Sequence, residues 1–282
     1  MLCTDLILCA GTLQHAGFVE LCDAARAGGF AGVSLYPTHV RRARAEGLGF
    51  AGMREVLAER GLVVADLDPL LNWMPGDDYR GELLASEEEW YRIAAELGAR
   101  SLNLAQISRP EVDIDAAAEA LAGVCDRARA AGLLVTLEYL PWAGIPDAAT
   151  ALAIVERAAR DNATLMIDTW HTFRGPTTDA QLQALPAARI GCVQINDAPD
   201  TSQTDLLTET LTARLLPGEG AIPLAHWLGM LGASGARVPV GVEVFSRVLD
   251  TMPPIEAARR CGEAARRVLG IPEACRLTPG CA

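Results

Sequence analysis

The sequence predicts an α/β protein consisting of a single (β/α)8 TIM barrel that spans residues 1–282. Short apolar runs rich in β-branched residues alternate with Ala-rich stretches of helical period, and eight such pairs follow one another. The runs are apolar on both faces, which is typical of parallel strands covered by helices. No linker divides the chain, so we expect one domain. The alternative architecture is an open doubly wound sheet.

The first four units occupy the N-terminal half of the chain. The expected strands cover residues 5–10, 32–36, 62–68 and 101–106, and the expected helices cover 18–27, 50–60, a stretch that starts at Ser86, and 115–131. Ser86 is followed by three glutamates. A serine hydroxyl before an acidic first turn is a helix start signal, because it accepts hydrogen bonds from free backbone N–H groups.

The last four units follow the same order. The expected strands cover residues 134–140, 164–170, 191–197 and 240–245, and the expected helices cover 147–160, 178–185, 223–235 and 253–269. Three longer connections are rich in Pro, Gly and polar residues, and they cover residues 37–49, 69–85 and 198–222. Loops that follow barrel strands build the active-site face, so substrate specificity is expected there.

The composition of the chain indicates which kinds of partner it can bind. The net charge is −12, the isoelectric point is about 4.8 and all 24 basic residues are arginine, since lysine is absent. Nucleic acid binding requires clustered basic residues, so a nucleic acid partner is not expected. No apolar stretch approaches the ~20 residues that span a bilayer. We therefore expect a cytoplasmic protein that acts on a small carbohydrate-like molecule without a membrane partner. Assembly into a homo-oligomer is left open.

Four oxygen-bearing side chains end four of the expected strands, namely Glu138, Asp168, Gln194 and Glu243. A carboxylate among apolar residues costs several kcal/mol unless a partner balances its charge. The carboxyl ends of barrel strands meet at one mouth, so these groups are expected to surround a shared divalent cation. An all-oxygen ligand set favours Mg²⁺ or Mn²⁺ over Zn²⁺.

Such a site is suited to chemistry next to a carbonyl group. A divalent metal ion acidifies the adjacent C–H bond by stabilising an enediolate. Glu138 and Glu243 are the expected acid/base pair, and pure coordination is their alternative role. His171 follows Asp168 by three residues, where a neutral imidazole can bond to a substrate oxygen and assist catalysis.

Four further residues are candidates for substrate binding. Arg214 and Arg174 match a carboxylate or phosphate through the planar guanidinium fork, and ordinary surface charge is the alternative. Trp142 and Trp170 follow ligand-bearing strands, where aromatic rings wall a substrate against water. Core packing is the alternative role of both tryptophans.

The runs LEYLPW, MIDTWHTFRG, VQINDAP and LPGEGAIPL, followed by GVEVF, resemble the xylose isomerase-like TIM-barrel superfamily of sugar isomerases and epimerases. The resemblance covers essentially the whole chain. It implies one Mn²⁺, Mg²⁺ or Co²⁺ ion held at these strand ends and proton transfer by two glutamates. By resemblance these roles fall on Glu138, Asp168 and Glu243, and the substrate-contacting histidine is His171.

Gln194 stands where sugar-epimerase members usually carry a histidine ligand. Together with the Arg-x-x-Pro-Gly-x-Gly stretch at residues 214–220, it resembles the 3-dehydroshikimate dehydratase branch of the superfamily. LEYLPW and the DTWHTFRG loop look more like uncharacterised sugar-phosphate isomerase/epimerase-type members. We therefore expect a metal-dependent isomerase or epimerase of a sugar-like α-hydroxyketone, anionic or neutral, with a dehydratase of the 3-dehydroshikimate type as the alternative.

Overall fold

The computed structural model describes residues 5–108, 110–202 and 204–272. Its centre is a closed barrel of parallel strands that pair in sequence order, which confirms the predicted fold class. The strands are β1 (Leu6–Leu8), β2 (Gly32–Leu35), β3 (Val63–Leu70), β4 (Ser101–Ala105), β5 (Leu134–Glu138), β6 (Ala163–Asp168), β7 (Ile190–Ile195) and β8 (Val240–Val242). Strands β1 and β8 pair with each other, so the sheet has no free edge.

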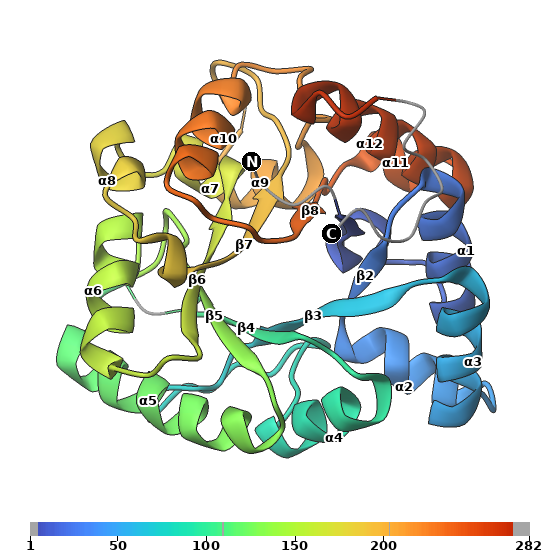
Figure 1. Ribbon diagram of the computed structural model, residues 1–282, viewed down its shortest axis with the longest axis horizontal. Coiled ribbons are helices and arrows are strands. Elements are labelled where there is room, and N and C mark those ends of the chain that lie inside the picture. The colour runs from blue at the N-terminus through green and yellow to red at the C-terminus, as the bar shows by residue number, and fades with distance from the viewer. Residues whose placement is uncertain (1–4, 109, 203, 273–282) are drawn as a thin grey trace.

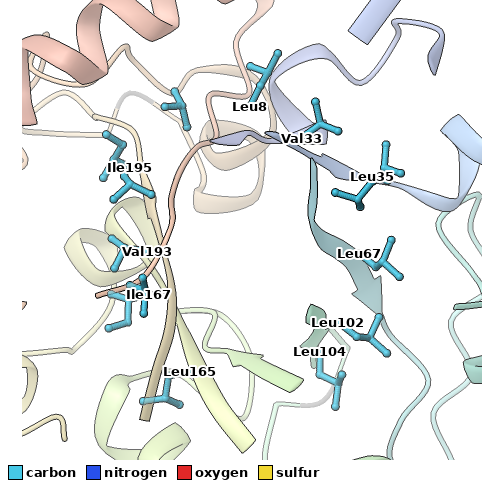
Figure 2. Close-up of a cluster of buried hydrophobic side chains, with 14 of the residues drawn as sticks. Leu8, Val33, Leu35, Leu67, Leu102, Leu104, Leu165, Ile167, Val193 and Ile195 are labelled. Atoms are coloured by element: carbon cyan, nitrogen blue, oxygen red, sulfur yellow. The ribbon is translucent and has the colours of Figure 1, made fainter. Parts of the chain in front are cut away.

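One set of alternating strand side chains belongs to the main hydrophobic core between the barrel and its helices. Figure 2 shows part of this layer around the strands, with Leu8, Val33, Leu35, Leu67, Leu102, Leu104, Leu165, Ile167, Val193 and Ile195 labelled. All of these residues are buried. Because successive side chains of a strand point to opposite faces, the residues between these positions face the barrel interior.

The other set of strand side chains points into the barrel and contains many polar groups. Asp66 of β3 accepts a hydrogen bond from Ser101 of β4 and lies 3.7 Å from the Cys192 sulfur of β7. Because β3 and β7 are not neighbours in the sheet, this contact crosses the interior. The barrel therefore contains polar side chains at several levels, and the candidate site lies at its carboxyl end.

The barrel is surrounded by helices, which Figure 1 shows as an outer ring. The ring consists of α1 (Phe18–Gly28), α2 (Pro37–Ala45), α3 (Phe50–Arg60), α4 (Glu87–Leu97), α5 (Ile114–Ala130), α6 (Ala148–Ala158), α8 (Asp179–Gln183), α10 (Leu224–Ala233) and α12 (Pro254–Leu269). The Ser86 hydroxyl accepts a hydrogen bond from Glu89 N at the start of α4, which confirms the predicted cap. Helix α1 packs against α12, so the ring of helices is closed.

Helices also occupy segments that the sequence predicted to be loops or strand ends. The segment 37–49 contains α2, because Pro37 at its first turn has a backbone angle suited to helix initiation. The segment 198–222 contains α9 (Leu206–Thr212), and α7 (Thr169–Arg174) follows β6 directly. The remaining short elements are η1 (Ala10–Leu13), η2 (Ala187–Arg189) and α11 (Arg247–Asp250). These corrections matter because α7 and α9 carry residues of the candidate site.

None of the helices within the described ranges combines the length and apolar character needed to cross a membrane.

Candidate active site

The structure brings the four predicted ligand residues to the carboxyl end of the barrel. Glu138 and Asp168 end β5 and β6, Gln194 lies one residue before the end of β7, and Glu243 follows β8. Asp168 pairs with Gln194 across β6 and β7, and Gln194 pairs with Gly241 across β7 and β8. All four side chains are buried. The strand register therefore holds these side chains at neighbouring levels of one barrel end.

Gln194 lies between two carboxylates. One end of its amide group is 3.3 Å from Asp168 Oδ2 and 3.1 Å from Glu243 Oε2. With nitrogen at that end, the amide donates to both carboxylates. With oxygen there, three oxygen atoms face one another, an arrangement that a cation stabilises. Both orientations occupy the same space, so the amide can pair with the carboxylates or serve as a metal ligand.

A second group of possible ligands overlaps with the first. Glu138, Asp168 and His171 each offer an atom within 4.8 Å of the others, a spacing that could hold a metal ion. His171 Nε2 lies 3.4 Å from Glu138 Oε1. Asp168 Oδ1 accepts hydrogen bonds from the backbone N–H groups of Trp170 and His171, which starts helix α7 and turns His171 toward Glu138. His171 is thus a candidate ligand as well as the predicted substrate contact.

Arg214 is the cation that the structure holds beside these carboxylates. Its Nη1 donates to Asp168 Oδ2 at 2.7 Å and lies 3.6 Å from Glu243 Oε2. Its Nε and Nη2 donate to the backbone carbonyl and the hydroxyl of Thr210, on α9. Arg214 lines the cavity, as a substrate-binding residue should, but its guanidinium group is already paired with two predicted metal ligands.

The two carboxylates beside Arg214 respond differently to burial. Burial by itself would raise the pKa of Asp168, but Arg214, His171 and the backbone N–H bonds outweigh it and hold that pKa below its ordinary value. Burial raises the pKa of Glu243 well above its ordinary value, and the negative charges of Asp68 and Glu138 add to this effect against Arg214. In the metal-free protein, Asp168 therefore favours its ionised form, whereas Glu243 favours its protonated form.

Two predicted substrate-binding residues, Trp170 and Arg174, do not line the cavity in this structure. The Trp170 ring is fully buried and donates to Glu209 Oε1, and Arg174 pairs with the same oxygen at 2.7 Å. Residues 170 and 174 are four apart in α7 and share one face, so they both point toward Glu209. Trp142 does line the cavity, with its ring centre 5.4 Å from that of His171.

Asp68 and Asn103 belong to the site although the sequence did not suggest them. Asn103 donates to Asp68 Oδ1 at 3.0 Å and to Glu138 Oε2 at 2.8 Å, while its own oxygen accepts from Thr136. Burial, followed by the charge of Glu138, raises the pKa of Asp68 to about 8. In the sequence, these two residues stand out as polar positions that alternate with apolar ones in the runs LVVADLD and SLNLA, which indicates that they face the barrel interior.

A cavity of about 420 Å³ opens above this group. Its lining includes the polar and charged residues Asp68, Glu138, His171, Thr210, Arg214 and Glu243. Among the described residues, Glu243 Oε1 and His171 Nδ1 are buried polar atoms that have no hydrogen-bond partner. Buried polar atoms of this kind are usually satisfied, so both atoms have capacity for a metal ion, a water molecule or a substrate atom.

The fold and the site define a parallel barrel with a buried, carboxylate-rich centre at the carboxyl ends of its strands. A family model described as "Xylose isomerase-like TIM barrel" matches residues 22–266. The chain belongs to this family, which confirms the resemblance seen in the sequence.

Curated relatives carry two kinds of name. A 3-dehydroshikimate dehydratase from Pseudomonas aeruginosa is 28% identical over 237 residues, which covers 80% of this chain and 36% of the relative. An inosose isomerase from Halalkalibacterium halodurans is 30% identical over 116 residues, which covers 40% of each protein. The chain therefore spans about two fifths of the length of these relatives or less.

Solved structures share the fold. The crystal structure of IolI protein with a bound zinc atom superposes with a TM-score of 0.84, covering 95% of this chain and 98% of the other at 18% identity. At this level of identity the likeness establishes the common architecture.

Proposed function

We propose that the chain is a divalent-metal-dependent isomerase or epimerase of a small α-hydroxyketone. Two buried glutamates that line one cavity, Glu138 and Glu243, carry this proposal. They stand on β5 and beyond β8, with β6 and β7 between those strands in the closed order. A substrate held between two such groups can lose a proton to one carboxylate and receive a proton from the other.

The donor atoms fit a hard divalent ion such as Mn²⁺ or Mg²⁺. Glu138, Asp168, Gln194 and Glu243 offer oxygen atoms, which these ions prefer. The unpartnered Glu243 Oε1 and the reversible amide of Gln194 support this assignment, because both can turn an oxygen toward a cation. A divalent ion bound there would stabilise negative charge that develops on the substrate carbonyl oxygen.

The residues that line the cavity have different roles in the proposed reaction. Glu138 and Glu243 are the two groups that exchange protons with the substrate, and the hydrogen bond that Glu138 accepts from Asn103 orients its carboxylate. Arg214 lines the cavity and can bond to a substrate oxygen while it stays paired with Asp168. Trp142 limits the access of water from one side.

Dehydration is a second candidate, favoured by a separate observation. The relative named 3-dehydroshikimate dehydratase aligns with 80% of this chain, and the sequence carries Gln194 where sugar epimerases usually carry histidine. Both reactions begin with removal of a proton next to a carbonyl group. In dehydration the electron pair then expels a β-hydroxyl as water, which requires an acid near that oxygen. His171 and Arg214 are the cavity residues able to assist that departure.

One experiment in D₂O separates these functions. The protein is incubated with Mn²⁺ and either inosose or 3-dehydroshikimate, and the products are analysed by mass spectrometry and proton NMR. Isomerisation or epimerisation incorporates solvent deuterium without changing the elemental composition otherwise. Dehydration produces a compound lighter by one water molecule. Absence of deuterium exchange and of water loss with both compounds, across a range of metals, would contradict the proposed chemistry for them.

Variants test the role of the glutamates. Glu243→Gln keeps the size and the hydrogen-bonding capacity of the side chain, so it should fold but lose exchange of the substrate α-proton. The control is Glu219→Gln, an exposed position outside the cavity, which should retain exchange. Exchange by Glu243→Gln at the rate of the unmodified protein would remove Glu243 as a proton carrier.

A further inference from the structure

The walls of the cavity differ in character from its floor. One wall is a small hydrophobic cluster, separate from the main core, formed by segments that follow β3, β4 and β5. The cluster contains Leu71, Ala105, Leu140 and Ala143, with Tyr79, Leu83, Ile107 and Trp142 packed against it. All of these residues except Ala143 line the cavity. The cluster therefore forms an apolar surface above the carboxylates.

The other wall comes from α9 and from the segment after β8. Leu207 and Leu211 of α9 are four residues apart and share one face, and both line the cavity together with Phe245. These leucines remain 54% and 47% exposed, although they are among the larger apolar side chains of the protein. An exposed apolar pair at the mouth of a cavity gains stabilisation when a ligand covers it.

The buried face of α9 explains why this pair stays at the mouth. Thr210 accepts hydrogen bonds from Arg214 through its hydroxyl and its carbonyl group. Glu209 is buried and accepts hydrogen bonds from Trp170 and Arg174. These polar contacts fix the inner side of the helix to the site, so Leu207 and Leu211 are held on the open side.

Hydrogen-bonding groups are concentrated at the floor. Tyr36 adds its hydroxyl group near Asp68 and Glu243, whereas the otherwise apolar walls contain the polar groups of Tyr79 and Trp142. A ligand with hydroxyl groups along its whole length would lose bonds to water against Leu207, Leu211 and the opposite cluster. That loss is costly, because unpaired polar groups pay the full cost of leaving water.

We propose that the substrate joins an α-hydroxyketone head to a largely hydrocarbon ring or chain, rather than being hydroxylated at every carbon. The head faces the carboxylates and Arg214, and the hydrocarbon body lies between the two apolar walls. This inference rests on the proposed function for the orientation of the head. The preference for a hydrocarbon body follows separately from the character of the walls.

A matched pair of ring compounds tests the proposal. The first is 2-hydroxycyclohexanone. The second is inosose, which has the same ring and ketone but carries a hydroxyl group on all of the remaining ring carbons. Binding of each compound is measured by titration calorimetry in the presence of Mn²⁺. Because each buried methylene group contributes to affinity, 2-hydroxycyclohexanone should bind about tenfold more tightly or better. Equal binding, or tighter binding of inosose, would overturn the proposal.

Variants locate the preference on α9. In the double variant Leu207→Ser and Leu211→Ser, the ratio of the two affinities should fall by about tenfold, because both side chains lose their apolar surface. The control is Val248→Ser, since Val248 is also exposed and apolar but does not line this cavity. The control should leave the ratio unchanged. An unchanged ratio in the double variant, together with a change in oligomeric state on gel filtration, would assign the leucines to a protein interface and overturn the proposal.

The binding assay is independent of turnover, so the two proposals fail differently. If neither ring compound exchanges its α-proton in D₂O but 2-hydroxycyclohexanone binds more tightly and depends on Leu207 and Leu211, the proposed reaction fails and the substrate class stands. If inosose exchanges its proton and binds more tightly than 2-hydroxycyclohexanone, the reaction stands and the substrate class fails.

Discussion

Arg214 Nη1 donates a hydrogen bond of 2.7 Å to Asp168 Oδ2, and both side chains are almost completely buried. The pair joins the end of β6 to the segment that follows α9, and these two segments are far apart in the sequence. It also supplies one positive charge in a site with several carboxylates. Arg214 is therefore expected to hold the site together when no metal ion is bound.

Substitution of Arg214 by methionine should destabilise the metal-free protein strongly, because it leaves the buried Asp168 carboxylate without its cation. The expected loss in the free energy of unfolding is about 3–5 kcal/mol. Saturating Mn²⁺ should recover part of this loss by supplying positive charge. Urea denaturation with a chelator and with Mn²⁺ measures both effects. Arg160→Met, which removes an exposed ion pair with Asp126, is the matched control and should change stability little. A loss no larger than that of the control would contradict a central role for the Arg214 pair.

Bound metal should raise the melting temperature of the protein, because a ligand that binds only the folded state stabilises it. At a metal concentration one hundred times the dissociation constant, the rise should be on the order of 5 °C. In Asp168→Asn this rise should disappear, whatever the melting temperature of the variant without metal. Asp66→Asn is the control, since Asp66 is also a buried barrel aspartate but bonds to Ser101 at a different level.

The same measurement identifies the metal. Mn²⁺, Mg²⁺ and Zn²⁺ are compared at equal concentration, with the oxygen ligands favouring the first two ions and His171 favouring zinc if it coordinates. His171→Gln should reduce the response to zinc more than the response to Mg²⁺. Equal shifts in Asp168→Asn and in the unmodified protein would place the metal elsewhere.

The meeting of Glu138 and Asp168 at one barrel end could be predicted from the sequence, whereas the directions of Trp170 and Arg174 could not. Glu138 and Asp168 interrupt apolar runs, and parallel strand order is enough to bring their carboxyl ends to one rim. The sequence suggests Trp170 as a cavity residue because it follows a strand, and Arg174 because a guanidinium group matches an anionic substrate. Their direction in the structure depends on α7 beginning directly after its N-cap Asp168, which places His171 at the cavity and directs the other two toward Glu209.

The Asp68 and Asn103 pair illustrates a second limit. Each residue is one polar position in an apolar strand, and neither forms a recognisable motif. Their importance arises from the lateral pairing of β3, β4 and β5, which lets one amide bridge two carboxylates. Alternation indicates that such residues face the barrel interior, but the contact itself depends on strand register, which this sequence pattern does not specify.

The raised pKa of Asp68 predicts how stability depends on pH in the metal-free protein. Between its ordinary pKa of 3.8 and its folded-state pKa of about 8, Asp68 keeps its proton in the folded state and loses it in the unfolded state. The folded state then binds more protons, so the free energy of unfolding falls as pH rises through this window. The contribution of Asp68 is fully present below that window and is lost above it.

Asp68→Asn should remove this contribution, because asparagine does not titrate. Urea denaturation at about pH 5 and about pH 8, with a chelator present, should show a drop in stability that is smaller in the variant by on the order of a few kcal/mol. Asp168 has the opposite sign, since its lowered pKa means that its stabilising effect is lost as pH falls below the ordinary range. An identical drop in the variant and the unmodified protein would exclude Asp68 as the titrating group.

Glu209 connects α9 to α7, and its removal provides the last prediction. Its Oε1 accepts from Trp170 Nε1 at 2.9 Å and from Arg174 Nε at 2.7 Å, and its side chain is 1% exposed. Glu87 makes a similar pair of contacts, with Tyr91 and Arg127, but its side chain is 25% exposed. The two glutamates therefore differ mainly in burial, which makes Glu87 a matched control.

Glu209→Gln should lower the free energy of unfolding by about 3 kcal/mol or more, because Arg174 then keeps a mostly buried charge without an opposite one. Glu87→Gln should cost less, because water screens the remaining Arg127 charge. Urea denaturation measures both losses. The Glu209 variant should also weaken binding of 2-hydroxycyclohexanone, because α9 loses an anchor that holds Leu207 and Leu211 at the cavity. Equal losses of stability in the two variants, or unchanged ligand binding in Glu209→Gln, would mean that α9 is positioned by Thr210 and Arg214 alone.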